Sequence, residues 1–121
     1  MNELNIKNYA HIGDAVWELY VREKTVFMTE NLKKLHDLTV SFVNAGFQTE
    51  LLQFLEEHLT EEEKELVKRA GNIKTSAARR IDRNLHRIAT EFEVLLGYNY
   101  LHNKDRLDEI LKLVEPKITN G

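Results

Sequence analysis

The sequence contains no cysteine, one proline (Pro116) and only five glycines in 121 residues. Without cysteine, disulfides, thiolate metal sites and cysteine nucleophiles are excluded. The scarcity of proline and glycine excludes a flexible linker or a repetitive fibrous segment. No apolar run approaches the ~18 residues that a membrane span requires, and no secretory signal opens the chain. We therefore expect a soluble, cytoplasmic protein with no membrane association.

The residues that are present suit one folded domain. Apolar residues make up 42% and charged residues 31%, which is too apolar for a disordered chain. The net charge of −3 is unevenly spread, because residues 68–87 carry seven basic side chains and one acid, a net +6, and the remainder carries −9. This clustering indicates an anion-binding surface, although a solvated helix face produces the same pattern.

Helical spacing of apolar residues dominates the chain, and no strand-like alternation of useful length occurs. Thr60 and Glu63 have the spacing of a capping box, and Asp82 and Asn103 are placed to cap two later helices. Gly71 is predicted to end the helix that Thr60 begins. Residues 71–81, between that helix and the one that Asp82 is placed to cap, show no periodic spacing of apolar residues and are predicted to form a basic loop.

These patterns predict an all-α, single-domain helical bundle of about six helices over residues 1–121, with tails at 1–8 and 115–121. Several helices are apolar on more than one face, which is compatible with a homodimer. The residues predicted to face inward on the first two helices are Ile12, Val16, Leu19, Leu32, Leu35, Leu38, Phe42 and Ala45.

Two carboxylates stand out because nothing on their own helices neutralises them. Asp14 and Glu93 each interrupt an apolar face and have no basic residue that relieves them one turn away, whereas Glu18 can pair with Arg22 and Glu91 with an arginine four residues earlier. A buried unpaired carboxylate is costly, so a compensating group is required. A shared Mg²⁺, an ion pair with a distant arginine, or protonation of one acid each satisfies that need.

The sequence around these acids resembles the ribonuclease III superfamily. HIGDAV at residues 11–16 and TEFEVLLGY at residues 90–98 are similar to its two helix signatures, and KRAGNIK at residues 68–74 is similar to its basic loop. The similarity is greater to the Mini-ribonuclease III branch, which keeps the nuclease domain and lacks a double-stranded-RNA-binding domain. It covers about residues 9–114.

The resemblance implies a ribonuclease III endonuclease-type fold and a metal-dependent endoribonuclease acting on double-stranded RNA. It implies that Asp14 and Glu93 are catalytic and hold Mg²⁺, with Mn²⁺ as a substitute, and that the enzyme is a homodimer. The implied substrate is the precursor of the large ribosomal RNA. The residues expected to bind RNA are Lys68, Arg69, Asn72, Lys74, Arg79, Arg80 and Arg83.

Departures from the wider pattern leave alternatives open. Ala10 and Thr90 stand where ordinary ribonuclease III domains carry two further acids, as in the Mini-ribonuclease III branch, and the basic loop lacks one arginine of the usual run. A non-catalytic RNA-binding or ribosome-assembly factor on the same fold would keep the basic surface without cleaving. A helical protein-interaction domain would instead pair the two acids with arginines.

Overall fold

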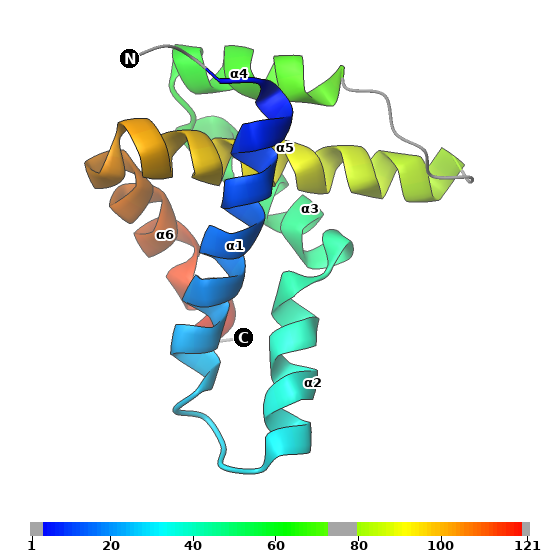
Figure 1. Ribbon diagram of the computed structural model, residues 1–121, viewed down its shortest axis with the longest axis vertical. Coiled ribbons are helices and arrows are strands. Elements are labelled where there is room, and N and C mark those ends of the chain that lie inside the picture. The colour runs from blue at the N-terminus through cyan, green and yellow to red at the C-terminus, as the bar shows by residue number, and fades with distance from the viewer. Residues whose placement is uncertain (1–3, 73–79, 120–121) are drawn as a thin grey trace.

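The computed structural model describes residues 4–72 and 80–119, and the side chains of all of these except residues 80–83. Over these ranges the chain is helical and contains no strand, in agreement with the predicted all-α class (Figure 1). A short 3-10 turn (Glu56–His58) follows the third helix. The α-helices are α1 (Ile6–Thr25), α2 (Leu32–Val43), α3 (Ala45–Leu55), α4 (Glu61–Gly71), α5 (Arg80–His102) and α6 (Lys104–Thr119).

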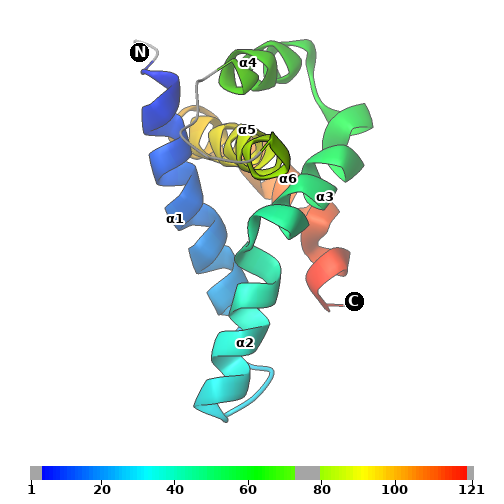
Figure 2. The same ribbon diagram turned by 90° about the vertical axis from the view of Figure 1, so that its right-hand side faces the viewer.

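Helix α5 is the centre of the fold. Helices α1, α3, α4 and α6 all pack against it, and Figure 2 shows it nearly end-on with the others around it. It can occupy that position because its second half is apolar on several sides, so that it buries surface against each neighbour. Its fully buried side chains include Phe92, Val94, Leu95 and Leu96.

The core has a large and a small part. The large part joins α1, α3, α5 and α6 and holds Trp17, whose indole N–H donates to the Phe42 carbonyl at 2.9 Å. The small part joins the first half of α1 to α4 and α5 through Tyr9, Leu66, Ala70 and Val94. Together the two clusters fix α1 across the middle of α5.

Local capping signals are confirmed at two helix starts. The Thr60 hydroxyl accepts from the Glu63 backbone N–H at 3.1 Å, and the Glu63 carboxylate accepts from the Thr60 N–H at 2.9 Å, which is a complete capping box. Asn103 caps α6, where its side-chain oxygen accepts from the Arg106 N–H at 3.2 Å. Helix α4 ends at Gly71 as predicted.

The predicted cap at Asp82 is wrong. Helix α5 begins at Arg80, so Asp82 lies within its first turn, where an acid still interacts favourably with the helix dipole. The predicted loop is also shorter than 71–81, because Gly71 belongs to α4 and residues 80–81 belong to α5. Residues 73–79, the rest of that loop, lie outside the described part of the chain.

The predicted tails are too long. Helix α1 begins at Ile6, and α6 continues through Pro116 to Thr119. Proline removes one hydrogen bond and crowds the carbonyl of the preceding turn, but Ile118 is buried in the core, which holds the last turn in place.

The buried faces of α1 and α2 differ from the prediction. Tyr9, Gly13, Trp17 and Val21 are buried on α1, whereas Leu19 is 61% exposed. The periodicity of α1 is compatible with two apolar faces, and the face that carries a glycine at the crossing is the one that packs. On α2 only Thr39 is buried, and most of the apolar residues that were expected to face inward are half-buried, with Leu32 exposed.

The second half of α1 and helix α2 project from the body as an antiparallel pair, which we call the α1–α2 arm (residues 14–43). Figures 1 and 2 both show this arm extending away from α5. It exposes large apolar side chains among its charged ones: Phe27 is 91% exposed and Leu32 80%. Exposed apolar side chains gathered on one part of a molecule are typical of an interaction site.

Candidate active site

Two glycines set the distance between α1 and α5. A Cβ atom on Gly13 would overlap the backbone carbonyl of Glu93, and one on Gly97 would overlap the backbone carbonyl of Tyr9. Neither glycine has a positive φ, so the requirement here is for close approach and not for unusual backbone geometry. The helices therefore touch backbone to backbone where α1 crosses in front of α5 (Figure 1).

This contact brings the two singled-out carboxylates together. Asp14 follows Gly13 directly, and Glu93 is the residue whose carbonyl Gly13 contacts. The Asp14 carboxyl lies within hydrogen-bonding reach of the Glu93 carboxyl. Asp14 is exposed and Glu93 is half-buried, so the pair lies at the solvent edge of the crossing. Asp14 thus does not share the burial of the apolar face that it interrupts, on which Trp17 is fully buried.

The pair is electrostatically strained. Burial and the neighbouring Asp14 carboxyl raise the pKa of Glu93 to about 8. Between two adjacent carboxyls, a proton or a cation relieves the repulsion. Of the three compensating groups that the sequence left open, the proton and the cation both suit two adjacent carboxyls.

The pair's chemistry fits a hard divalent cation. Carboxylate oxygens are the ligands that such ions prefer, with water and substrate phosphate completing the shell, and the exposed side of Asp14 leaves room for both. Within residues 4–72 and 80–119, no three His, Asp or Glu side chains converge as a metal cluster. Thr90 contributes no carboxylate, and its hydroxyl donates to the His86 carbonyl at 2.8 Å.

The neighbouring acids behave largely as predicted. Glu18 pairs with Arg22 at 3.0 Å, one turn along α1. Burial raises the pKa of Glu91 more than the charge of Arg87 lowers it, so the arginine relieves Glu91 only partly. Neither acid therefore joins the Asp14–Glu93 pair.

Comparison with known proteins identifies the family of this chain. The Ribonuclease III domain profile matches residues 7–104. A Mini-ribonuclease 3 from Gloeobacter violaceus is 41% identical over 115 residues, covering 95% of this chain and 85% of that protein. One from Synechocystis sp. is 43% identical over 106 residues, covering 88% of this chain and 74% of that protein. The chain belongs to the Mini-ribonuclease 3 family.

A solved structure supports the same assignment. An X-ray crystal structure of a protein from Fusobacterium nucleatum superposes with a TM-score of 0.85 at 30% identity, covering 98% of this chain and 95% of that chain. The resemblance drawn from the two signatures is thus confirmed, together with the ribonuclease III fold type. The chain is an endoribonuclease of the ribonuclease III type, from a family that acts on double-stranded RNA and generally depends on a divalent metal.

Only part of the predicted RNA-binding set of this Mini-ribonuclease 3 family member can be placed. Lys68, Arg69 and Asn72 are exposed at the end of α4. Arg80 and Arg83 belong to the first turns of α5, but their side chains lie outside the described part of the structure, as do Lys74 and Arg79 altogether. Gly71 lies against the side chain of Glu91, so the end of α4 packs against α5 two residues before Glu93.

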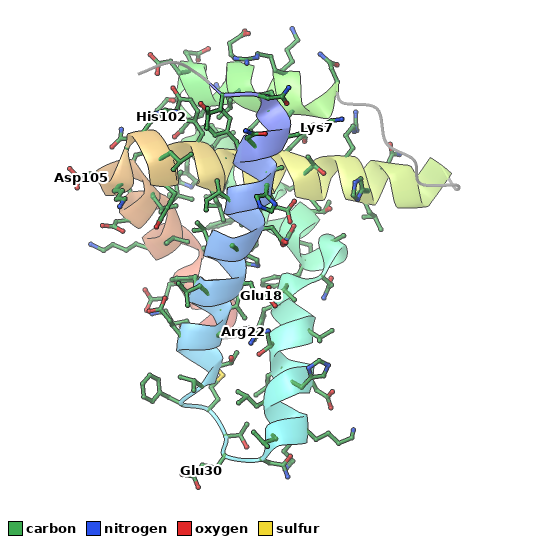
Figure 3. The ribbon with its side chains drawn as sticks, viewed as in Figure 1. Lys7, Glu18, Arg22, Glu30, His102 and Asp105 are labelled. Carbon is green, nitrogen blue, oxygen red and sulfur yellow. The ribbon has the colours of Figure 1, made fainter. Side chains whose placement is uncertain are left out.

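The sequence interpretation also passed over two residues near the site. Lys7 and His11 precede Asp14 on the same side of α1, and both are exposed. Their spacing from Asp14, seven and three residues, places them on the same side of a helix and could have indicated them from the sequence. Figure 3 shows Lys7 on the upper part of α1 and Glu18 further down the same helix.

Across the described residues, no helix is long and apolar enough to cross a membrane.

Proposed function

We propose that this enzyme hydrolyses phosphodiester bonds in double-stranded RNA with Asp14 and Glu93 as its catalytic residues, and that the two carboxylates hold Mg²⁺, with Mn²⁺ as a substitute. The observation that carries the proposal is the glycine-mediated crossing of α1 and α5, which sets an exposed carboxylate against a half-buried one. Such a pair is unfavourable without a cation, so its persistence in the fold favours metal binding.

The bound cation would lower the pKa of a water molecule and neutralise charge on the scissile phosphate. The protein's part is to present two ionised carboxylates at one place. Because the pKa of Glu93 is raised to about 8, its proton must leave as the cation binds. Metal affinity should therefore rise with pH up to about that value. With only two carboxylates, the affinity should be modest and much of the shell should be water.

Binding of the RNA would rest on phosphate contacts. Lys68, Arg69 and Asn72 are exposed at the end of α4, and Lys74, Arg79, Arg80 and Arg83 extend the basic stretch in the sequence. Such contacts give salt-dependent affinity with little reading of sequence. Duplex RNA is recognised chiefly by its shape and its 2′-hydroxyls. We take the precursor of the large ribosomal RNA as the substrate and the cytoplasm as the location.

A homodimer belongs to this proposal. The two strands of a duplex need two cleavage events, and a two-fold dimer offers one site to each strand. The α1–α2 arm is the surface that supports it, because Phe27, Leu32 and Leu19 are its most exposed apolar side chains.

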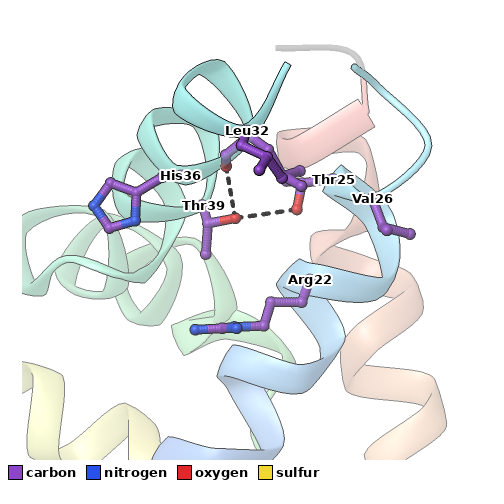
Figure 4. Close-up of a pocket in the computed structure, with 7 residues that line it drawn as sticks. Arg22, Thr25, Val26, Leu32, His36 and Thr39 are labelled. Atoms are coloured by element: carbon purple, nitrogen blue, oxygen red, sulfur yellow. Dashed lines mark hydrogen bonds between the residues drawn. The ribbon is translucent and has the colours of Figure 1, made fainter. Parts of the chain in front are cut away.

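The arm also has a shape that suits self-association. A pocket of about 340 Å³ lies between α1 and α2, next to the projecting Phe27. Figure 4 shows the Thr39 hydroxyl inside this pocket bonded to Thr25, at 3.2 Å, while Arg22 and His36 line it together with apolar side chains. Such a hollow beside an exposed aromatic ring can receive a side chain of a second copy.

The test is a cleavage assay on a duplex RNA at low salt with Mg²⁺, comparing the wild type with Asp14→Asn and Glu93→Gln. We expect the wild type to cut and both variants to lose activity by at least 100-fold while binding the duplex normally. If the wild type binds the duplex but leaves it intact with both Mg²⁺ and Mn²⁺, the protein is a non-catalytic RNA-binding factor and the proposal fails.

A further inference from the structure

We propose that the outer face of α1 ahead of Asp14, formed by Lys7 and His11 and called here the α1 phosphate face, binds the backbone of an RNA strand leading to the carboxylate pair. The inference rests on the proposed function, since it assigns the path of that same substrate. It adds a binding surface outside the basic stretch of residues 68–87.

The geometry of α1 places these residues in line. Lys7, His11 and Asp14 are separated by four and three residues, so they follow one another along one side of the helix. With a rise of ~1.5 Å per residue, Lys7 lies about 10 Å along the helix axis from Asp14, and His11 about 4.5 Å. All three side chains are exposed. A strand held at Asp14 would therefore pass over both donors.

The chemistry of this face suits phosphate. Residues 4–13 contain no Asp or Glu, and their exposed polar side chains are those of Lys7, His11 and asparagines, which offer N–H donors. Within the described part of the chain, the Lys7 and His11 side chains make no ion pair or hydrogen bond. Neither group is needed to hold the fold, so both are free to contact a ligand.

The surface of α1 after Asp14 differs from the surface before it, and this difference indicates on which side of Asp14 the RNA lies. After Asp14 the helix carries the Glu18–Arg22 ion pair and the exposed Leu19, a mixed and apolar surface that suits a protein partner. Figure 3 shows Lys7 at one end of α1 and Arg22 toward the other. RNA is thus expected on the side of Lys7, and the second subunit on the side of the arm.

Helix α4 lies on the other side of α1. Tyr9 of α1 packs with Leu66 and Ala70 of α4, so the first half of α1 lies against the last turns of α4. Because Tyr9 is two residues from both Lys7 and His11, the α1 phosphate face points away from that contact. The face is therefore a cationic surface separate from the basic end of α4. An acidic protein would also bind cations, but the position of Asp14 at the end of this face favours RNA as the ligand.

The experiment measures binding of a short RNA duplex by fluorescence anisotropy in EDTA, over a range of NaCl concentrations, for Lys7→Gln, His11→Ala and the double variant. Lys7→Gln should weaken binding about three- to ten-fold and reduce the slope of log affinity against log salt by about one. Lys7→Arg should keep both. His11→Gln, which keeps a donor, should retain more affinity than His11→Ala. In Mg²⁺ the double variant should show a higher KM with little change in kcat.

The control is Lys112→Gln, which removes an equally exposed lysine from α6. An unchanged affinity and salt slope in the double variant, with wild-type protein that still cleaves the duplex, would overturn the α1 phosphate face and leave the nuclease assignment intact. Equal losses in Lys112→Gln would also overturn it, since any lysine would then serve. Loss of binding in the double variant of a protein that never cleaves would retain the face and reject the proposed function.

Discussion

At the scale of single residues, the carboxylate of Glu93 is the most consequential group in the molecule. Its raised pKa means that the metal-free folded protein holds a proton that the unfolded chain releases above pH 4.5. Folding stability should therefore fall as the pH rises from about 4.5 to about 8, and the full penalty should be present above that. The site is built at the expense of stability.

Replacing Glu93 by glutamine should therefore stabilise the metal-free protein. The gain should be absent at pH 4 and reach about 1–3 kcal/mol at pH 9, allowing for solvent screening of a half-buried group. Urea unfolding in EDTA across this pH range measures it. The control is Glu65→Gln at an exposed position on α4, which removes the same charge. A gain that is equal at pH 4 and pH 9, or equal in both variants, contradicts the argument.

The glycine at position 97 is the second residue on which the site depends. In Gly97→Ala the new methyl group would overlap the Tyr9 carbonyl and press on Ile12. Alanine favours a helix by ~0.5–1 kcal/mol, but forcing two backbones apart costs more, so we expect a net loss of about 1–3 kcal/mol together with reduced metal affinity.

Gly46→Ala is the matched control for that substitution. Gly46 also lies in a helix, and the nearest atom to its new Cβ would be the Asn44 side-chain oxygen at 3.2 Å, which can shift slightly. Its free energy of unfolding should change by less than about 1 kcal/mol. Urea unfolding of both variants distinguishes the effect of the α1–α5 crossing from that of helix propensity. Equal changes in the free energy of unfolding would show that the close α1–α5 contact does not determine the loss of stability.

At the scale of elements, a buried polar network joins α4, α5 and α6. The Glu63 carboxylate accepts from Arg106 at 2.8 and 2.9 Å and from Asn99 at 3.2 Å. Arg106 also donates to the His58 carbonyl at 2.7 Å. Burial alone would raise the pKa of Glu63, but these hydrogen bonds and that of the Thr60 N–H lower it. One residue thus caps α4 and ties it to two other helices.

The stabilisation by this network should be lost in acid. Because the pKa of Glu63 is lowered on folding, its contribution is present above its unfolded pKa of 4.5 and disappears as the pH falls through the folded value. Arg106→Met leaves a buried carboxylate unpaired, so it should destabilise by about 3–5 kcal/mol at pH 7. Its deficit should shrink at pH 3, because the Glu63 left unpaired in the variant has lost the hydrogen bonds of Arg106 that lower its pKa and takes up a proton in acid; urea unfolding at both pH values measures this. A deficit independent of pH would assign the loss to packing alone.

The two helix starts at Thr60 and Asn103 could be predicted from sequence because their signals are local. The capping box at Thr60 needs only Glu63 three residues later, and Asn103 needs only the next turn. The start of α5 and the extent of α6 could not be predicted, because packing overrides local propensity. The buried Ile118 stabilises the last turn of α6, which follows Pro116. Asp82 lies within α5, because that helix already includes Arg80.

The site was predictable only in part, for a similar reason. The spacing of charges showed that Asp14 and Glu93 lacked partners, and the resemblance of the two signatures paired them. The glycine crossing that brings them together joins residues about 80 positions apart, and no local pattern shows which face of α1 meets α5. The hydrogen bonds of Arg106 to Glu63 and to His58 join residues 43 and 48 positions apart, and no local pattern shows them either.

At the scale of the whole molecule, the α1–α2 arm should hold two copies together. Burying Phe27 and Leu32 would contribute about 1.5–3 kcal/mol per side chain, and a two-fold axis counts each twice. We therefore expect the wild-type chain of 14.2 kDa to sediment as a dimer at micromolar concentration. Phe27→Ser combined with Leu32→Ser should weaken the dimer at least 100-fold, because four buried side chains are lost.

Leu101→Ser is the control for that experiment, since it removes an exposed leucine at the far end of α5 from the arm. It should leave the sedimentation profile unchanged. The monomeric arm variant should keep its helical circular dichroism, because neither Phe27 nor Leu32 belongs to the core. It should then lose coordinated cleavage of the two RNA strands and accumulate nicked duplex, because single sites would act independently. A wild type that is monomeric at every concentration, or an arm variant that still dimerises, would show that the two-site arrangement is not built on this surface.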